Sequence, residues 1–302
     1  MGINRECLNG VRLGIDMGGT LTKFLVLENG EKKYEDSLPT PNVSCEEITR
    51  FLIEKYRKIS NHFKIERVGI GVPGVVTNGL VDTDNLPIHH APLCEMLKKG
   101  INKPITIDND ANCAALAEAT FVDGKCDNLV MVTIGTGIGG GIILDGQIRR
   151  GRGGLGELCH MSIEATRGKR CSCGHRGCWE SYASTTALVS CAERAARGHT
   201  DSYLYKLYRQ DNQLNGILIF RALRENCPVA KAVFSGYLDK LAVGIKNIIY
   251  IFDPDVVVLA GGITKDGDLF LDDLKEKVRT DVPIRISVLQ NEAGAYGAAI
   301  LQ

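Results

Sequence analysis

The sequence has no excess of either charge. Lys and Arg together number 36, Asp and Glu also number 36, and the formal net charge at pH 7 is zero. Proteins that bind nucleic acids or anionic membrane surfaces usually carry a basic excess, because it attracts the phosphate groups of these partners. The balanced charge therefore predicts that this chain has neither kind of partner.

Long apolar runs are also missing. A helix needs about 20 consecutive apolar residues to span a bilayer, and no run in the 302 residues approaches that length. The first residues, MGINRECLNGVRL, lack the apolar core of a secretory signal peptide. Position 6 holds Glu where a myristoylation signal has Ser or Thr. These absences predict a cytoplasmic protein.

Cysteine, by contrast, is abundant, with 11 residues in the chain. The count is odd and seven cysteines stand alone, which argues against a secreted disulfide framework. Three others lie close together in CSCGHRGC, residues 171–178. Such a cluster fits a metal site, a redox centre or a disulfide knot. A redox centre would favour Cys-x-x-Cys at a helix start, whereas a single residue separates Cys171 from Cys173.

Two stretches of the chain look alike. Residues 13–30 (LGIDMGGTLTKFLVLENG) and 132–148 (VTIGTGIGGGIILDGQI) both read as an apolar strand, a Gly/Thr turn and a second apolar strand. Glycines in such turns bring bare backbone N–H groups to the surface. We therefore predict a duplicated chain of two α/β halves, each opening with a β-hairpin, and a cleft that holds a phosphate-bearing ligand.

Apolar periodicity predicts the other main elements. The expected strands are 34–38, 67–74, 104–110 and 255–262, and the expected helices are 46–60, 111–120, about 228–252 and from about 292 onward.

The segment GTGIGG, residues 135–140, matches the residue pattern G-x-G-x-x-G of the dinucleotide-binding fingerprint, but its structural context differs. That fingerprint needs a helix after the glycines, whereas strand-like GIILDG follows here. The P-loop pattern is absent. Two interpretations stay open: a hairpin that cradles phosphates with backbone N–H groups and the Thr136 hydroxyl, or a structural glycine turn. Asp16, before the first turn, likewise fits a Mg²⁺ ligand or a turn-initiating residue.

Eight segments taken together are far more specific than any one of them. They are IDMGGT (15–20), GVPGVV (71–76), TDNLP (83–87), DNDAN (108–112), GTGIGGG (135–141), GELCH (156–160), CSCGHRGCWE (171–180) and LAGGI (259–263). In this order, over nearly the whole length, they resemble the motifs of the ROK family of sugar kinases. The resemblance implies an α/β fold of the two-lobed actin-like/hexokinase (ribonuclease H-like) type, duplicated, with a central cleft. It also implies ATP-dependent phosphorylation of a hexose, with ATP and Mg²⁺.

Glucose, phosphorylated at its 6-hydroxyl, is the leading acceptor under this resemblance. N-acetylmannosamine, N-acetylglucosamine, fructose and allose remain alternatives, because neither GVPGVV nor TDNLP indicates whether an N-acetyl group fits. The family also includes DNA-binding repressors, but those carry an added helix-turn-helix domain, and only about ten residues precede the first strand here. A non-catalytic sugar-binding regulator is a further rival, against which Asp110, Asp16 and both glycine turns argue.

The resemblance also assigns roles to single residues. Asp110 is expected to be the general base toward the sugar hydroxyl, although an Asp at this place could also be a plain helix N-cap. The expected substrate-binding residues are Gly74, Asn85, Asn109, Asp110, Glu157, His160 and Glu180. The expected nucleotide-binding residues are Asp16, Gly18, Gly19, Thr20, Lys23, Gly135, Thr136, Gly137, Gly261 and Gly262.

The cysteine cluster corresponds to the family's zinc loop. The expected ligands are His160, Cys171, Cys173 and Cys178. Three thiolates and one imidazole form a tetrahedral set typical of structural Zn²⁺. His175, inside the loop, is expected to face solvent. Two departures from the family pattern are Cys159, where Gly is usual and whose side chain is expected to point away from the metal, and Asp108, where Glu is common.

The lobes can be placed on the sequence. The small lobe, with the sugar side and the catalytic Asp, is expected to span 1–116 plus 290–302. The large lobe, with the nucleotide side, the zinc loop and the dimerisation surface, is expected to span 117–289. The resemblance implies a homodimer and closure of the lobes around sugar and ATP.

Overall fold

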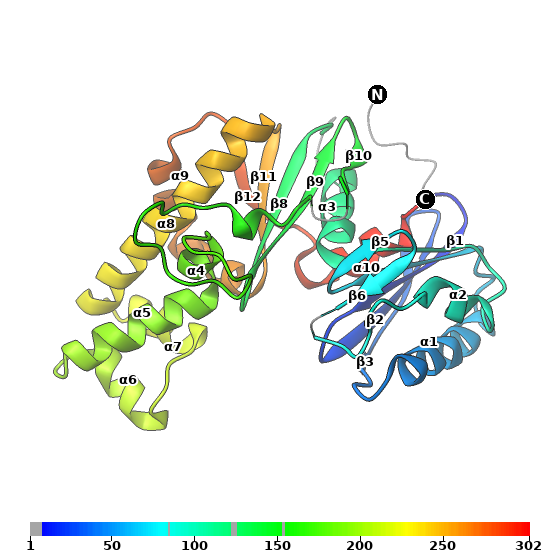
Figure 1. Cartoon of the computed structure of the whole chain (residues 1–302), viewed down its shortest axis with the longest axis horizontal. Coiled ribbons are helices and arrows are strands. Elements are labelled where there is room, and N and C mark those ends of the chain that lie inside the picture. Colours follow the sequence, from blue (N-terminus) through cyan, green and yellow to red (C-terminus); the bar gives the residue numbers. More distant parts are fainter. Residues whose placement is uncertain (1–7, 84, 122–125, 153–154) are drawn as a thin grey trace. The chain divides into compact units, whose positions relative to one another are not determined.

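A computed structural model describes residues 8–83, 85–121, 126–152 and 155–302 (Figure 1). Asp84, in the predicted sugar-side loop, lies outside these ranges. The chain forms two compact units: the first comprises Met1–Met131, Gly141–Gly156 and Val288–Gln302, and the second Val132–Gly140 and Glu157–Ser287. By this division 117–131, 141–156 and 288–289 belong to the first unit, whereas the sequence prediction assigns them to the large lobe.

The first unit contains a five-stranded sheet. Its order is β3-β2-β1-β4-β7, at Glu31–Pro39, Leu21–Glu28, Val11–Met17, Arg67–Val72 and Ile105–Asn109. β1, β2 and β3 are antiparallel neighbours, whereas β1 pairs with β4, and β4 with β7, in parallel. The hairpin predicted over 13–30 is confirmed as β1 and β2. Since β1, β4 and β7 run the same way, their carboxyl ends share one edge of the sheet.

Helices cover both faces of this sheet (Figure 1). The main ones are α1 (Cys45–Ser60), α3 (Asp110–Phe121) and α10 (Ala293–Ala299), and the shorter elements are β5 (Val75–Thr77), β6 (Leu80–Asp82) and α2 (Leu93–Lys98). Neighbouring residues of β2 point to opposite faces. Val26 packs in a core with Leu52 of α1, whereas Leu25 packs in a second core with Ala299 of α10.

The second sheet has the order β10-β9-β8-β11-β12. Its strands are Gln147–Ile148, Ile138–Leu144, Leu129–Ile134, Val256–Ala260 and Ile284–Ile286. β9 pairs with β10 antiparallel, and β11 with β12 in parallel. The hairpin predicted over 132–148 is confirmed as β8 and β9, with the short β10 after a second turn. Both glycine segments therefore lie between adjacent strands, as the sequence predicts.

Helices make up most of the second unit. They are α4 (Glu180–Ala183), α5 (Thr185–Gly198), α6 (Tyr203–Asp211), α7 (Gly216–Arg224), α8 (Pro228–Phe252) and α9 (Leu271–Val278), with the 3-10 helices η2 (Leu158–His160) and η3 (Gly262–Leu269). A third 3-10 helix, η4 (Gln290–Glu292), precedes α10 in the first unit. Ser184, Ser202 and Asn215 cap α5, α6 and α7, each accepting a hydrogen bond from a backbone N–H three residues on.

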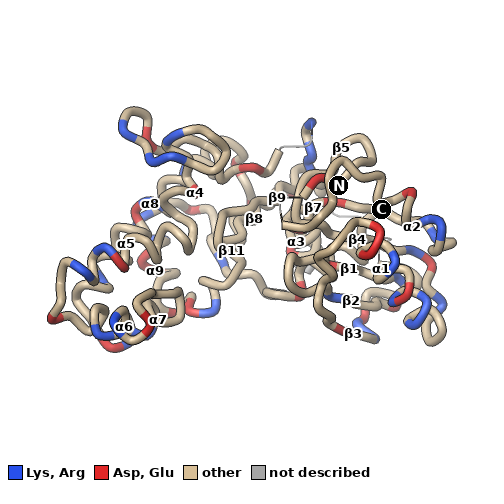
Figure 2. The backbone as a smooth tube through the Cα atoms, turned by 60° about the horizontal axis from the view of Figure 1, so that its bottom comes forward, with Lys and Arg blue, Asp and Glu red and all other residues tan. Residues whose placement is uncertain are grey.

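Charged residues of both signs are interspersed along both units (Figure 2). Within the described ranges, none of the helices combines the length and apolar character that a bilayer span demands.

The longest of these helices, α8, packs its buried side against the only tryptophan of the chain. Trp179 is fully buried, and its indole N–H donates to the carbonyl oxygen of Lys240, at 3.0 Å. A Cβ atom added at Gly244 would lie 2.0 Å from Cε2 of this ring. Gly244 therefore lets the helix approach the indole closely.

Gly244→Ala is expected to destabilise the protein, because the rigid ring and the helix backbone must separate. Such overpacking typically costs about 2 kcal/mol, or about 6 °C in Tm for a unit of this size. Gly236→Ala on the same helix is the matched control, since nothing lies within 4 Å of its added Cβ. Thermal unfolding should show Gly236→Ala unchanged or more stable, since Ala favours helix over Gly by about 1 kcal/mol. Equal melting of the two variants would contradict this packing.

Candidate functional site

The predicted catalytic segments meet at one edge of the sheet in the first unit. The parallel register pairs Asp16 of β1 with Gly71 of β4, and Gly71 with Asp108 of β7. The residues that follow these strands therefore emerge side by side. The carboxyl edge of parallel strands is where α/β proteins bind ligands, because loops and helix N-termini converge there.

Asp16 lies at this edge within a small polar cluster. Its Oδ2 is 3.5 Å from the Nζ of Lys23, which also donates to the carbonyl oxygen of Asn291. A Cβ at Gly294 would come within 2.7 Å of the Asp16 carboxylate, so only glycine fits there. Burial raises the pKa of the Asp16 carboxyl, and the charge of Lys23 opposes that rise. The carboxylate is thus largely withdrawn from solvent and has one cationic neighbour.

The turn of the first hairpin, Gly18–Thr20, is closed by a hydrogen bond from Gly18 N to Leu21 O, at 2.9 Å. Asn85 lies beside this turn, because a Cβ at Gly19 would be 3.5 Å from the Cβ of Asn85. The structure therefore brings the predicted sugar-side residue Asn85 next to the predicted phosphate turn.

Asp110 and Asn109 stand at the junction of β7 and α3. Asp110 begins the helix, and its Oδ1 accepts a hydrogen bond from Ala111 N at 2.8 Å. Asn109 Oδ1 accepts from the N–H groups of Ala111 and Asn112, at 2.9 and 3.1 Å, and its Nδ2 donates to Gly74 O at 3.0 Å. Asn109 thus caps α3 and fastens the predicted sugar loop to it, a role that the sequence prediction did not include.

Asp108 is buried, with a side chain only 3% exposed. Its Oδ2 accepts from Arg150 Nε and Nη2, at 2.7 and 2.6 Å. Its Oδ1 accepts from Asn109 N and Asn112 Nδ2, at 2.8 and 2.9 Å. Sequence reasoning noted Asp108 only as a conservative change and missed Arg150, because nothing local signals a partner 42 residues away.

The second glycine turn, Gly135–Gly137, lies in the second unit against the start of α5. Thr185 N donates to Gly135 O at 2.8 Å, and Thr186 Oγ1 donates to Thr136 O at 2.7 Å. Glu180 Oε2 accepts from Ile138 N at 3.0 Å. The predicted sugar ligand Glu180 therefore also holds the base of the predicted phosphate turn.

Gly261 approaches the end of β8. It has a φ of 98°, and a Cβ there would lie 2.3 Å from Ile134 O. Only glycine meets both conditions without strain. The predicted adenosine-side turn, Gly261 and Gly262, therefore lies close to the strand that leads into Gly135.

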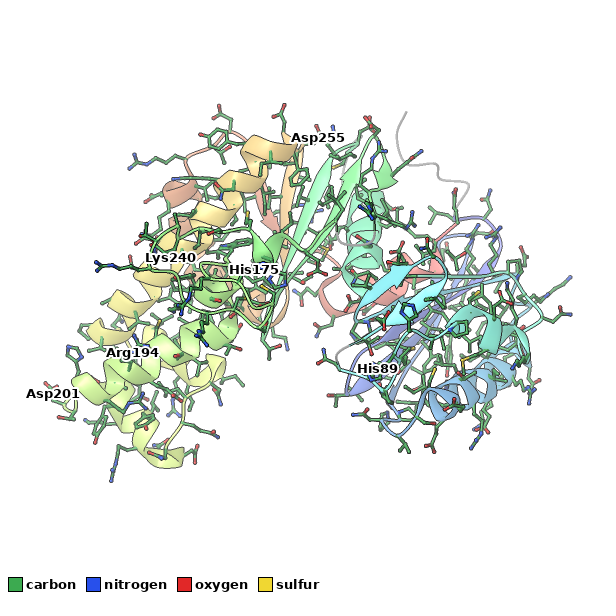
Figure 3. The ribbon with its side chains drawn as sticks, viewed as in Figure 1. His89, His175, Arg194, Asp201, Lys240 and Asp255 are labelled. Carbon is green, nitrogen blue, oxygen red and sulfur yellow. The ribbon has the colours of Figure 1, made fainter. Side chains whose placement is uncertain are left out.

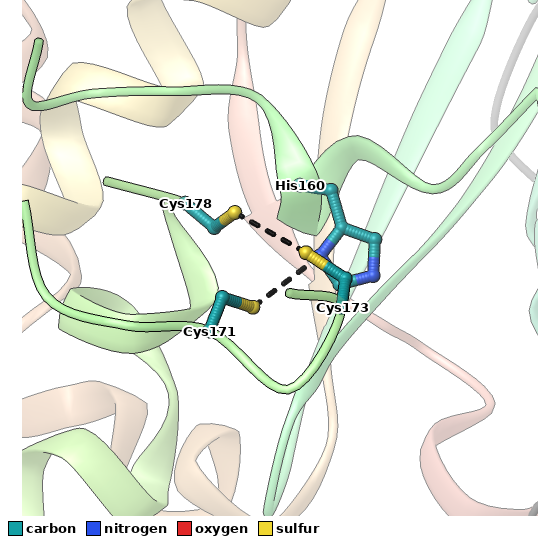
Figure 4. A group of neighbouring side chains, drawn as sticks. All are labelled: His160, Cys171, Cys173 and Cys178. Carbon is teal, nitrogen blue, oxygen red and sulfur yellow. Dashed lines mark hydrogen bonds between the residues drawn. The ribbon is translucent and has the colours of Figure 1, made fainter. Parts of the chain in front are cut away.

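Four predicted metal ligands gather around one point in the second unit (Figure 4). The ligand atoms of His160, Cys171, Cys173 and Cys178 all lie within 4.8 Å of one another. Cys173 Sγ is 3.6 Å from Cys178 Sγ, and Cys171 Sγ is 3.7 Å from His160 Nδ1. Tetrahedral Zn²⁺ with Zn–S bonds of about 2.3 Å would separate two sulfurs by about 3.8 Å. The donor set and its spacing both fit such an ion.

The electrostatics of the cluster also suit a cation. Burial alone would raise the pKa of the Cys171 thiol, but hydrogen bonds from Cys173, Ser172 and Cys178 outweigh it and lower the pKa to about 6. Burial and the neighbouring sulfurs raise the pKa of Cys178 to about 12. Hydrogen bonding within the cluster therefore favours the thiolate form of Cys171, which is the form that binds metals.

Two other side chains lie near the cluster. His175 is exposed between Cys173 and Cys178 in the sequence (Figure 3), with its Nδ1 3.5 Å from Cys173 Sγ. Cys159 is buried, and its Sγ donates to Glu157 Oε2 at 3.5 Å. Burial, followed by the Glu157 and Glu180 carboxylates, raises the pKa of Cys159, which keeps this thiol protonated. Cys159 therefore pairs with Glu157 and lies outside the four-ligand group.

A cavity of about 530 Å³ opens in the second unit between residues 169–172 and α5. Thr136 and Glu180 line it together with Lys169, Arg170 and Arg194, the last on α5 (Figure 3). Three cations against one carboxylate make this cavity attractive to anions. Sequence reasoning missed these residues, although the basic run RGKR before Cys171 was a signal.

Comparison with known proteins gives consistent matches. A model of the ROK family matches residues 12–302. A glucokinase of Thermotoga maritima is 34% identical over 304 residues, covering 95% of this chain and 95% of that protein. An N-acetylmannosamine kinase of Vibrio cholerae is 33% identical over 258 residues, covering 83% of each. The crystal structure of a ROK family glucokinase from Streptomyces griseus, in complex with glucose and AMPPNP, has a TM-score of 0.80 at 30% identity, covering 96% of this chain and 98% of that chain.

Proposed function

Since this chain belongs to the ROK family and is an ATP-dependent sugar kinase with an actin/hexokinase-type fold, we propose that glucose is its substrate and the 6-hydroxyl its acceptor. Support comes from the 34% identity to a protein named glucokinase and from the similar structure that holds glucose and AMPPNP. The N-acetylmannosamine kinase at 33% identity keeps that sugar as the second candidate.

The position of Asp110 supports its role as the base in this reaction. Its carboxylate stands at the start of α3, at the same sheet edge as Asp16. Phosphoryl transfer needs a group that orients the acceptor hydroxyl and takes its proton, while cations and N–H donors stabilise the charge on the phosphate. We assign the first role to Asp110 and the second to the glycine turns.

We propose that ATP binds to the two glycine turns and to the polar cluster at Asp16. The residues proposed to bind ATP are Asp16, Gly18, Gly19, Thr20, Lys23, Gly135, Thr136, Gly137, Gly261 and Gly262. Asp16 would help to hold Mg²⁺, directly or through water, and Lys23 beside it would attract phosphate oxygens. Mg²⁺, when bound, neutralises charge on the phosphate groups.

The residues proposed to bind the sugar are Gly74, Asn85, Asn109, Asp110, Glu157, His160 and Glu180. Asn109 keeps one amide N–H for a sugar hydroxyl, because the other donates to Gly74 O. Glu180 Oε2 accepts from Ile138 N, and its Oε1, which accepts a long hydrogen bond from Cys171 Sγ at 4.0 Å, keeps a second lone pair for the sugar. The hydrogen-bond donors and acceptors that remain unused limit each of these two side chains to one or two contacts with the sugar.

We also propose a structural Zn²⁺ bound by His160, Cys171, Cys173 and Cys178. Nδ1 of His160 is the proposed ligand atom, since it lies 3.7 Å from Cys171 Sγ. Its Nε2 then carries the proton and donates to a sugar hydroxyl. The ion, when bound, supplies only rigidity to the loop that carries Glu180. We keep Cys159 and His175 outside this ligand set.

A sugar panel tests the substrate. ADP formation is measured with ATP, Mg²⁺ and, in turn, glucose, N-acetylmannosamine, N-acetylglucosamine, fructose and allose. We expect glucose to give the highest kcat/KM and the product to be the 6-phosphate. A higher kcat/KM with any other sugar would overturn the assignment to glucose and leave the kinase activity intact. Sugar binding without ADP formation would instead indicate a non-catalytic regulator.

A homodimer and a cytoplasmic location complete the proposal. The dimer is what the resemblance to the family implies. The ten described cysteines form no disulfide with one another, which suits a reducing compartment. Sedimentation of the purified protein distinguishes a dimer from a monomer.

A further inference from the structure

We propose that Arg150 is a positioning residue for phosphoryl transfer: it fixes Asp108, and through Asp108 the strand–helix junction that carries Asp110. The inference rests on the proposed role of Asp110. It adds a residue that no motif includes, and it places a reaction determinant in the segment that follows β10.

Asp108 carries a buried negative charge. A carboxylate that is only 3% exposed is costly unless a cation and hydrogen bonds compensate it. Arg150 supplies both, because two of its nitrogens donate to the same oxygen, Oδ2, at 2.7 and 2.6 Å. The Arg150 side chain itself is 52% exposed, so the guanidinium remains partly hydrated while it neutralises the buried partner.

The other carboxylate oxygen of Asp108, Oδ1, binds residues on both sides of Asp110. Oδ1 accepts from Asn109 N and from Asn112 Nδ2, at 2.8 and 2.9 Å. These donors lie on either side of Asp110 in the chain. The rotamer of Asp108 therefore determines how the backbone enters α3 just before and just after Asp110.

The side chain of Asn112 is held by Asp108. Asn112 is buried, and within the described ranges its Oδ1 has no hydrogen-bond partner. Among the described residues, its side chain makes one hydrogen bond, from Nδ2 to Asp108. If Asp108 turns, the Asn112 side chain loses that hydrogen bond, and the first turn of α3 is then held by the Asn109 cap alone, which places it less rigidly. A displacement of about 1 Å at a reacting group can cost about 100-fold in rate.

The side chain of Asn109 makes further hydrogen bonds at the same junction that involve neither Asp108 nor Arg150. Asn109 caps α3 and holds Gly74 without any contribution from Arg150. Losing Arg150 should therefore leave the sugar loop attached and substrate binding nearly intact. The expected signature is a lower kcat with little change in KM.

The test compares Arg150→Met with Arg149→Met. Arg149 is the adjacent arginine, but it pairs with the exposed Asp145, so the two variants lose the same charge at neighbouring positions. With the sugar that the wild-type protein phosphorylates best, we expect Arg150→Met to lower kcat by about 30- to 100-fold and to leave both KM values within about threefold. Arg149→Met should stay within about twofold of wild type, and Arg150→Lys should recover part of the loss.

Stability is separated from positioning by the double variant Asp108→Asn/Arg150→Met. It leaves no unpaired buried carboxylate, so its Tm should return toward that of the wild type, while kcat stays at least about tenfold low. Full recovery of kcat together with Tm would reduce Arg150 to a stabilising role and overturn the inference. So would equal kcat for Arg150→Met and Arg149→Met. Absence of sugar phosphorylation by the wild type would instead refute the proposed function.

Discussion

Asp110→Asn is expected to remove nearly all turnover, with kcat lowered by about 1,000-fold. General base catalysis contributes typically about 10² to 10⁴ in rate, and a 1,000-fold loss corresponds to about 4 kcal/mol in the activation barrier. The amide matches the carboxylate in shape and can still accept the hydrogen bond that Ala111 N donates to Asp110. It cannot accept a proton from the sugar hydroxyl. The measurement is steady-state ADP formation with saturating glucose and ATP.

The control for this substitution is Asp145→Asn. Asp145 is 82% exposed and pairs with Arg149, away from the junction of β7 and α3, so its loss should leave kcat unchanged. The KM for glucose in Asp110→Asn should change only a few-fold, because the amide retains a hydrogen-bonding group toward the sugar. Near-normal turnover of Asp110→Asn would refute the general-base role. It would show instead that Asp110 serves as a helix N-cap.

Removal of the proposed zinc is expected to have the second largest effect. Structural zinc in isolated zinc-finger peptides contributes on the order of 10–16 kcal/mol at neutral pH, and part of such an energy would hold residues 160–180 together. Cys173→Ser and Cys178→Ser should abolish metal binding, lower the Tm and raise the KM for glucose by about tenfold, the lower end of what loss of metal-site support usually costs. Metal analysis, thermal unfolding and sugar kinetics on the same samples provide the measurement.

Cys191→Ser is the matched control for the zinc prediction. Cys191 is a half-buried cysteine of α5 that lies outside the four-ligand group, so the variant should keep one zinc per chain and the wild-type KM. Purified wild-type protein without stoichiometric zinc would refute the metal site. A wild-type KM in Cys173→Ser would refute its coupling to the sugar.

Elements governed by local patterns were predictable from the sequence. The two glycine hairpins follow from apolar strands on either side of a Gly/Thr turn, and the structure has both. The helix predicted over about 228–252 is found as Pro228–Phe252, since its apolar residues recur at helical spacing without interruption. The gathering of His160 with the three cysteines was also predicted, because the resemblance to the family supplied the distant ligand.

What the sequence did not reveal lies in tertiary hydrogen bonds. Asn109 reads as a polar residue of a sugar-binding motif, yet both ends of its amide are engaged by the helix N-terminus and by Gly74. The bond between Glu180 and Ile138 N spans 42 positions, as does the pair of Arg150 and Asp108. No periodicity or spacing rule reports such partners, since they depend on how strands and loops are brought together in the folded chain.

Trp179 gives the second unit a built-in optical probe. It is the single tryptophan of the chain, and its neighbours in sequence are the metal ligand candidate Cys178 and the sugar ligand candidate Glu180. Its ring is fully buried against Gly244, and its N–H is fixed by Lys240 O. Indole fluorescence depends on the polarity around the ring, and no second tryptophan contributes background. The emission of the intact protein therefore reports on one loop, without any label attached.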